Sequence, residues 1–123
     1  MTDLIACLSE GKGTSAHVAK VIEGMEWNKV FLVTTSLFKD RLTSKNLNKG
    51  KEVEIIAIDT RKTITEMSAE IRKALEGKIS DLEVALNIVS GEGREHMAVI
   101  SALLHLGLGI RLVALTREGV RVI

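Results

Sequence analysis

Short apolar runs of strand length alternate along the chain with longer segments whose apolar residues recur at helical spacing. A run that is apolar at nearly every position is typical of a strand buried on both faces, as in a parallel sheet. Five such runs predict buried strands, and a short sixth strand is expected near residue 123. The predicted strands span residues 4–8, 30–33, 53–58, 84–89, 110–115 and 120–123.

The segments between the first five strands have the pattern of amphipathic helices. In the first segment, Val18, Val21, Ile22 and Met25 lie at positions i, i+3, i+4 and i+7, which predicts a helix over residues 15–25. The three later segments predict helices over residues 36–42, 64–77 and 94–106.

Local signals mark the start of two helices and one long loop. Ser36 is expected to cap the second helix through its hydroxyl group. Thr63 and Glu66 have the spacing of a capping box at the start of the third helix. Residues 43–51 are polar and rich in turn formers, so they predict a loop.

The order of the predicted elements is β-α-β-α-β-α-β-α-β-β. This alternation predicts an α/β fold, a Rossmann-like doubly wound, mostly parallel six-stranded sheet. The last two strands are expected to form a C-terminal antiparallel strand pair, because a parallel crossover needs about a dozen connecting residues. No linker divides the chain, so residues 1–123 are expected to form a single domain.

Composition narrows the function classes. Of 123 residues, 46% are hydrophobic, which suits one well-buried core, and the net charge of +1 argues against a protein that coats nucleic acid. No apolar run reaches the ~18 residues of a membrane span, and no targeting segment precedes the first strand. The expected location is therefore the cytoplasm. The lack of glutamine beside many charged residues favours a heat-adapted source.

The single cysteine and the histidines do not have the spacing of a metal site. Cys7 lies in the first apolar run, so we expect a buried thiol without an internal disulfide partner. His17, His96 and His105 are neither paired at i, i+4 nor near the cysteine, so no metal and no cofactor are predicted. His105 is expected in the core or at an interface, and Trp27 is expected to pack near the opposite end of the sheet.

Two polar, glycine-containing turns follow the first and fourth predicted strands, at Ser9–Ser15 and Ser90–Arg94. With strand order 3-2-1-4, these turns face each other where the strand order reverses, the usual ligand position of doubly wound sheets. Each turn leads into a helix N-terminus, which favours anions, and Lys12 and Arg94 add positive charge. We therefore predict a phosphate-binding crevice. His96, one turn into the fourth helix, is a ligand contact, an acid/base group, or a solvated or capping histidine.

A structural alternative stays open at both turns. Their glycines can serve the backbone alone, and Thr14 or Ser15 can be a simple N-cap. Gly11–Ala16 also matches the dinucleotide fingerprint G-x-G-x-x-G/A. The second strand, however, ends in hydroxyl residues with no acid before Asp40 to hold a ribose, which counts against NAD.

The predicted helix over residues 94–106 is apolar around most of its circumference. A helix that is apolar on several sides is buried on several sides. In a small domain the second cover is expected to be another subunit, so we predict a symmetric homodimer. The alternative is a helix buried between neighbouring helices of its own chain.

The two turns and the closing strand pair (Ser9–Ser15, Ser90–Arg94 and Ile110–Ile123) give the chain a resemblance to the CRISPR-associated Rossmann fold (CARF) domains. The resemblance implies a homodimer that binds a cyclic oligoadenylate second messenger across its two-fold axis, in CRISPR type III defence. Glu92 departs from the family pattern, which has a small or hydroxyl residue there, and an acid would oppose phosphate approach unless Arg94 neutralises it. The family usually fuses this domain to a winged helix or a nuclease, and these 123 residues are expected to contain neither, so no DNA-binding domain is predicted.

The resemblance leaves two uses open, sensing the messenger or degrading it as a metal-independent ring nuclease. In cleavage, a ribose 2′-hydroxyl would attack its adjacent phosphate, with Lys12 and Arg94 supplying charge and Ser9 orientation. A nucleotide-binding module of another kind and a purely structural dimerisation module are the alternatives. The residues expected at the ligand are Ser9, Gly11, Lys12, Gly13, Thr14, Ser15, Thr34, Thr35, Ser90, Gly91, Glu92, Gly93, Arg94 and His96.

Overall fold

Strands and helices alternate through the computed structural model, which describes residues 2–9, 12–45 and 52–123, without the side chains of residues 12–13 and 41–45. In chain order the elements are β1 (Leu4–Cys7), α1 (Lys12–Glu23), β2 (Val30–Thr35), α2 (Ser36–Lys45), β3 (Val53–Ile58), α3 (Ile64–Leu75), β4 (Glu83–Asn87), α4 (Gly93–His105), β5 (Gly109–Thr116) and β6 (Gly119–Val122).

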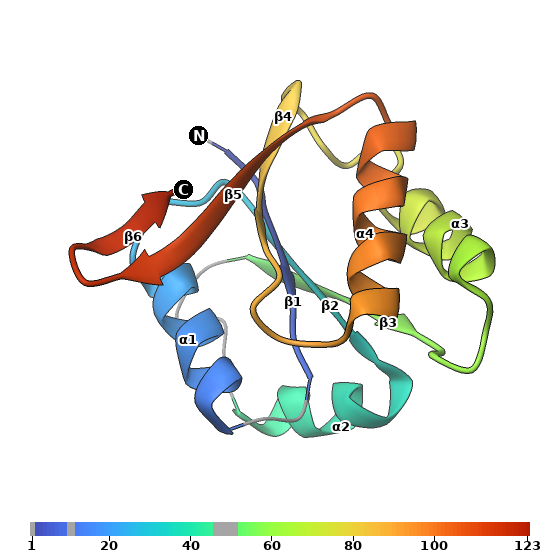
Figure 1. Cartoon of the computed structure of the whole chain (residues 1–123), viewed down its shortest axis with the longest axis horizontal. Coiled ribbons are helices and arrows are strands. Elements are labelled where there is room, and N and C mark those ends of the chain that lie inside the picture. Colours follow the sequence, from blue (N-terminus) through green and yellow to red (C-terminus); the bar gives the residue numbers. More distant parts are fainter. Residues whose placement is uncertain (1, 10–11, 46–51) are drawn as a thin grey trace.

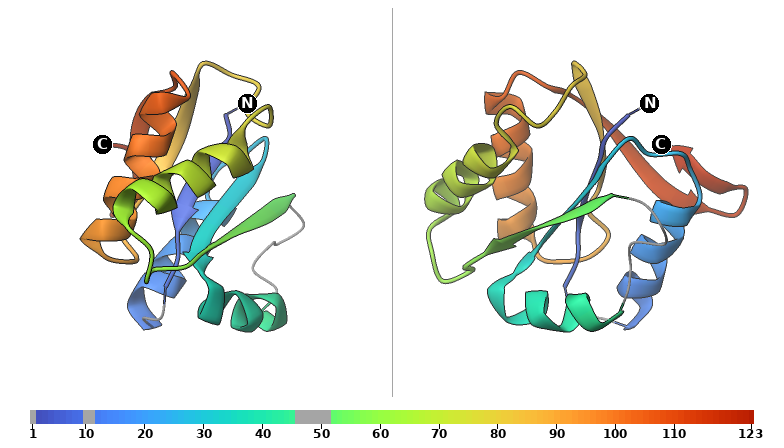
Figure 2. Two further views of the ribbon diagram at one scale, coloured as in Figure 1. Left: turned by 90° about the vertical axis from the view of Figure 1, so that its right-hand side faces the viewer. Right: turned by 180° about the vertical axis from the view of Figure 1, so that it is seen from behind.

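The six strands form one sheet in the order β3-β2-β1-β4-β5-β6, which confirms the predicted fold class. The first five strands are parallel to their neighbours, and β6 pairs antiparallel with β5. Helices α3 and α4 lie side by side on one face of the sheet, and α1 lies on the other (Figure 1 and Figure 2). The strand order reverses at β1, between β2 and β4, so the carboxyl ends of β1 and β4 are neighbours.

The core has two halves because side chains along a strand point alternately to opposite faces. In β1, Ile5 and Cys7 pack in the half covered by α3 and α4. Leu4 and Ala6 pack in the half covered by α1 and α2. Both halves are apolar, which explains why the strand is a continuous apolar run rather than an alternating one.

Helix α1 begins earlier than the predicted residue 15. It starts at Lys12, so Thr14 and Ser15 lie inside the first turn and neither is the N-cap. The helix ends at Glu23, and the next residue, Gly24, lies against the last strand. A Cβ atom built there would come within 2.4 Å of Val120 Cγ2, so glycine lets this end of α1 approach β6 closely.

The predicted cap of α2 is wrong by one residue. Ser36 is the first helical residue, and Thr35 Oγ1 accepts a hydrogen bond from Phe38 N at 3.1 Å. Strand β2 continues to Thr35 because its pairing with β3 extends to Ile58, and this places the threonine at the cap position. The helix also includes residues 43–45 of the predicted loop, and residues 46–51 lie outside the described part of the chain.

Helix α3 has the predicted capping box. Glu66 N donates to Thr63 Oγ1 at 3.1 Å, and Thr63 N donates to Glu66 Oε1 at 3.2 Å. The hydrogen bonds that Thr63 N and Thr63 Oγ1 donate to Glu66 Oε1 hold the pKa of the Glu66 carboxyl below its usual value. Among the helices that the structure describes, none is long and apolar enough to cross a membrane.

Helix α4 packs on the sheet through one face only. Ala98, Val99 and Leu103 are fully buried, but Met97 and Leu104 are each 62% exposed. This exposure contradicts the alternative in which neighbouring helices of the same chain surround α4. His105 is exposed, so it is not a core histidine.

Candidate functional site

The two glycine-containing turns meet, as the sequence predicts. Ser9 N donates to Ser90 Oγ at 2.8 Å, and the two hydroxyl oxygens are 3.2 Å apart. The neighbouring strands β1 and β4 make this contact possible, because Ala6 is paired with Asn87 just before the two turns. Ser90 is fully buried, so its hydroxyl group joins the two turns inside the protein rather than at the surface. We call the place where the two turns meet the crevice, a name that marks this location at the edge of the sheet and not a cavity.

The two glycines at the start of α4, Gly91 and Gly93, have different roles. Gly91 has a φ of +98°, a conformation that favours glycine, and a Cβ atom there would lie 2.6 Å from Glu95 Oε2. A Cβ atom at Gly93 would meet nothing within 4 Å in the described part of the chain. The turn therefore requires Gly91, whereas Gly93 leaves the N-terminus of α4 open.

An acid that the sequence analysis did not single out faces this turn. Glu95 Oε2 accepts a hydrogen bond from Glu92 N at 3.3 Å, across the N-terminus of α4. Burial, with the nearby Glu95 carboxylate as the second cause, raises the pKa of the Cys7 thiol to about 12. Glu95 thus lies between the α4 N-terminus and the end of β1. Glu95 stands three residues after the N-cap Glu92, and this capping-box spacing is a sequence signal that could have identified it.

His96 braces the same turn. Its Nε2 atom lies 2.8 Å from the carbonyl oxygen of Ser90. A carbonyl oxygen only accepts hydrogen bonds, so Nε2 carries the proton and donates it. In the neutral ring, Nδ1 is then the acceptor that remains for another group.

Arg94 binds backbone on a different loop. Its Nη1 donates to the carbonyl oxygen of Thr60 at 2.8 Å, and its Nη2 donates to the carbonyl oxygen of Lys62 at 2.7 Å. The guanidinium group therefore ties the start of α4 to the loop between β3 and α3. Both acceptors are neutral carbonyl oxygens, so the guanidinium group keeps its charge and one further N–H on each terminal nitrogen.

The turn after β1 is described only in part. Gly11 lies outside the described residues, and of Lys12 and Gly13 only the backbone, in the first turn of α1, is described. Thr14 and Ser15 are half-buried in that turn. The predicted role of Lys12 as a positive charge at the crevice therefore stays a prediction.

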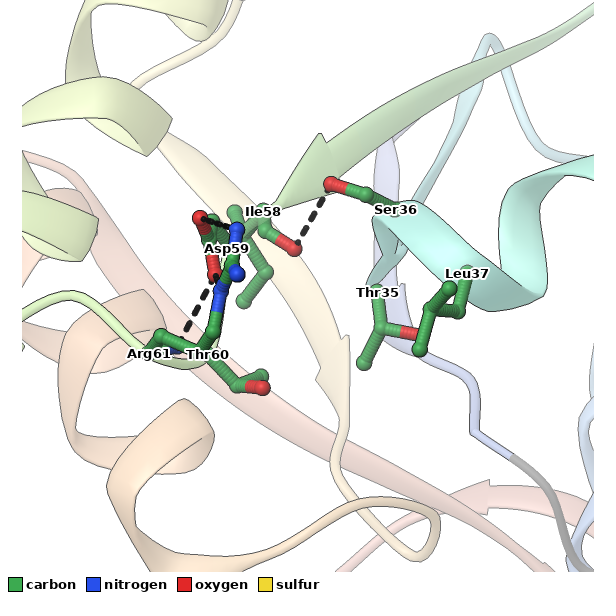
Figure 3. A pocket seen from close by; sticks show the side chains of 7 residues that line it. All are labelled: Thr35, Ser36, Leu37, Ile58, Asp59, Thr60 and Arg61. Carbon is green, nitrogen blue, oxygen red and sulfur yellow. Dashed lines mark hydrogen bonds and ion pairs between the residues drawn. The ribbon is translucent and has the colours of Figure 1, made fainter.

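The two threonines at the end of β2 point to opposite faces of the sheet. Thr34 is buried, and its Oγ1 has no hydrogen-bond partner among the residues that the structure describes. Thr35 lines a cavity of about 270 Å³ at the start of α2, shown in Figure 3. The other residues that line this cavity are Ser36, Leu37, Ile58, Asp59, Thr60 and Arg61. This cavity was not among the predicted sites, because it joins the end of β2 and the start of α2 to four residues that end or follow β3.

A buried polar cluster explains why β4 ends at Asn87, two residues before the predicted Val89. Asn87 Nδ2 donates to the carbonyl oxygen of Val113 at 2.9 Å and lies 3.2 Å from His17 Nε2. Leu115 N also donates to His17 Nε2, at 3.4 Å. The cluster connects α1, β4 and β5, so His17 has a structural role.

The structure contains no group of three or more potential metal ligands within its described ranges. A scan against protein-family models finds no match, and no curated protein is similar in sequence to this chain. What is established is therefore an α/β fold with a mostly parallel six-stranded sheet, whose two polar turns meet where the strand order reverses.

Proposed function

We propose that the chain binds a cyclic oligoadenylate in the crevice, as its resemblance to CARF domains implies. The observation that carries the proposal is the contact between Ser9 and Ser90, which joins the two turns at the reversal of strand order. Ligands of doubly wound sheets bind beyond the carboxyl ends of the strands at this point.

The chemistry of the crevice suits the two kinds of group in a ribonucleotide. At the start of α4 the capping box of Glu92 and Glu95 uses two backbone N–H groups, and the N–H groups that remain favour a phosphate because they lack helical acceptors. A phosphate alone would be opposed by the carboxylate of Glu95. A ribose hydroxyl, however, can donate a hydrogen bond to that carboxylate, so phosphate and sugar together fit better than an inorganic anion.

The second part of the proposal is a symmetric homodimer through α4. Met97 and Leu104 belong to an outward stripe that lines an apolar hollow of about 430 Å³ with Ile100, Ser101 and His105. The stripe carries no acidic or basic group except His105, so two copies can meet without opposing like charges. A two-fold axis would bring two crevices to one ligand with repeated nucleotide units.

Binding is proposed rather than ring cleavage. Cleavage needs positive charge at the developing phosphorane, and two backbone carbonyl oxygens of the β3–α3 loop hold the Arg94 guanidinium group against that loop. Ser9 is also paired, with Ser90. Lys12 is the remaining candidate for that positive charge. Linear products after incubation with cyclic tetra-adenylate would establish cleavage.

The direct test is calorimetric titration of the protein with cyclic tetra- and hexa-adenylate beside NAD, ATP and AMP. We expect one ring per two chains, bound far more tightly than any of the three other nucleotides. Gly93→Leu should abolish that binding, because its side chain would occupy the open N-terminus of α4.

Thr65→Leu is the matched control, since Thr65 is an exposed residue in the first turn of α3. Both variants should fold like the parent protein. Failure of every cyclic oligoadenylate to bind, or unchanged binding in Gly93→Leu, contradicts the proposal.

A further inference from the structure

The cavity at the start of α2 lies on the same edge of the sheet as the crevice. Strands β1, β2 and β3 are parallel neighbours, so the carboxyl ends of all three point to one edge. The crevice lies beyond β1 and β4, and the cavity lies beyond β2 and β3. One extended ligand can therefore reach both places along this edge.

A flat cation borders one side of the cavity. Arg61 Nε and Nη2 donate to the two carboxylate oxygens of Asp59, each at 3.0 Å, which fixes the plane of the guanidinium group. The Arg61 hydrogen bonds hold the pKa of Asp59 down at about 2, so the carboxylate stays ionised at neutral pH. The Arg61 side chain is 89% exposed, so its flat face is accessible. Planar guanidinium groups stack on aromatic rings and nucleobases.

The opposite side of the cavity is apolar. Leu37 lies across the cavity from Asp59 and Arg61 in Figure 3, and it is 88% exposed although it is a large aliphatic residue. Ile58 contributes a second apolar wall at the end of β3. A flat ring placed between Leu37 and Arg61 would cover apolar surface on one face and stack on a cation on the other.

The hydrogen-bonding groups and the volume of the cavity indicate which kind of flat ring it can bind. Ser36 and Thr60 line the cavity with hydroxyl groups. Ser36 Oγ donates to the carbonyl oxygen of Ile58 at 3.3 Å, so it offers a lone pair to a base, whereas the hydroxyl group of Thr60 can donate or accept. The volume of about 270 Å³ is just below the ~300–1,000 Å³ of pockets for drug-sized ligands. The space therefore suits one base rather than a whole dinucleotide.

Arg94 joins the two places. It lies in the turn that borders the crevice, and it holds the carbonyl oxygens of Thr60 and Lys62 in the loop that borders the cavity. The loop that carries Arg61 is thus fixed to the N-terminus of α4. Arg94 acts as a positioning residue between the two.

We propose that this cavity is a nucleobase site, in which a purine lies between Leu37 and the Arg61 guanidinium group. That the base belongs to the ligand of the crevice rests on the function proposed above.

The test uses AMP as the probe for the cavity alone, followed by ¹H–¹⁵N NMR of the whole chain. Chemical shifts of residues 35–37 and 58–61 are expected to move on titration with AMP. Arg61→Lys keeps the charge but loses the planar fork, so it should weaken AMP binding about tenfold. Arg117→Lys, at an exposed arginine in the β5–β6 turn, should leave it unchanged.

A second matched pair removes the apolar wall. Leu37→Ala should weaken AMP binding by a smaller factor than Arg61→Lys. Leu82→Ala should have no effect, because Leu82 is an 83% exposed leucine just before β4, at the opposite edge of the sheet.

The outcomes separate this proposal from the function of the crevice. No shift at residues 35–37 and 58–61, or equal AMP affinity in Arg61→Lys and the parent chain, overturns the nucleobase site. Shifts there without binding of any cyclic oligoadenylate support the nucleobase site and overturn the proposed function. If Arg61→Lys leaves the affinity for a cyclic oligoadenylate unchanged, the proposed function is supported. The proposal that a base of this ligand enters the cavity is then overturned.

Discussion

Helices α3 and α4 lie side by side on the same face of the sheet, but their outward faces differ in chemistry. The exposed residues of α3 are mostly polar, among them Thr65, Arg72 and Lys73. The exposed residues of α4 include Met97 and Leu104. Packing on a sheet explains only one apolar stripe per helix, so it does not explain the second stripe of α4. The comparison therefore distinguishes a helix that completes the fold from one for which we propose an interface.

The largest effect is expected from a charge on the outward face of α4. Leu104→Glu should raise the dimer dissociation constant at least a hundredfold, about 2.7 kcal/mol, because two carboxylates would be buried at a two-fold axis. Light scattering would then show the 13.4 kDa monomer.

Ala69→Glu places the same charge on the exposed face of α3 and should leave the dimer intact. If Leu104→Glu behaves like Ala69→Glu, or if the parent chain is already monomeric, the difference between the two helices has no role in assembly.

The second effect concerns the starts of the two helices. Helix α4 begins after Gly91, whose positive φ strains any residue with a side chain and whose added Cβ atom would displace the carboxylate of Glu95. Gly91→Ala should lower the free energy of unfolding by about 2 kcal/mol, measured by urea denaturation. At α3 the corresponding device is a hydroxyl cap, so Thr63→Ala should cost only about 1 kcal/mol. A smaller loss in Gly91→Ala than in Thr63→Ala would contradict the assigned role of the turn.

The smallest effect is a pH dependence of the free energy of unfolding, caused by Cys7 in the half of the core that α3 and α4 cover. Burial and Glu95 raise the pKa of Cys7 from 9.0 to about 12. The unfolded chain therefore loses the thiol proton first as the pH rises above 9, and stability falls by about 1.4 kcal/mol at pH 10. In Cys7→Ala, the loss of stability between pH 8 and pH 10 should be smaller by that amount. Equal losses in the parent chain and the variant would mean that Cys7 titrates normally.

The α/β class and the mostly parallel sheet could be predicted because they depend on the patterns of many residues. The strand order 3-2-1-4, on which the meeting of the two turns depends, was an assumption that only the structure establishes. Each buried strand is a run of four or more apolar side chains, and the alternation with helices restricts the connections to right-handed crossovers. The capping box of Thr63 and the burial of Cys7 followed from local signals in the same way. Trp27 packs as predicted, with its Nε1 donating to the carbonyl oxygen of Val21 at 3.0 Å.

Single side chains with distant partners could not be predicted. Arg94 suggested a charge for phosphate, but its acceptors are 34 and 32 residues away, in a loop whose position depends on β3 and α3. Glu95 gained its place beside Cys7 only when α4 packed over the end of β1. The cap of α2 moved to Thr35 because pairing with β3 extended the strand.

The amino-acid sequence by itself determined the α/β class and the mostly parallel sheet, whereas the strand order was established by the tertiary structure. Hydrophobic periodicity and turn chemistry act locally and repeat along the chain, so they can be recognised without coordinates. Only the tertiary structure decided that Arg94 binds the β3–α3 loop, that Leu37 and Arg61 face each other across a cavity, and that α4 leaves an apolar face exposed. Those contacts join segments far apart in sequence, and their energies exist only once the sheet has brought the segments together.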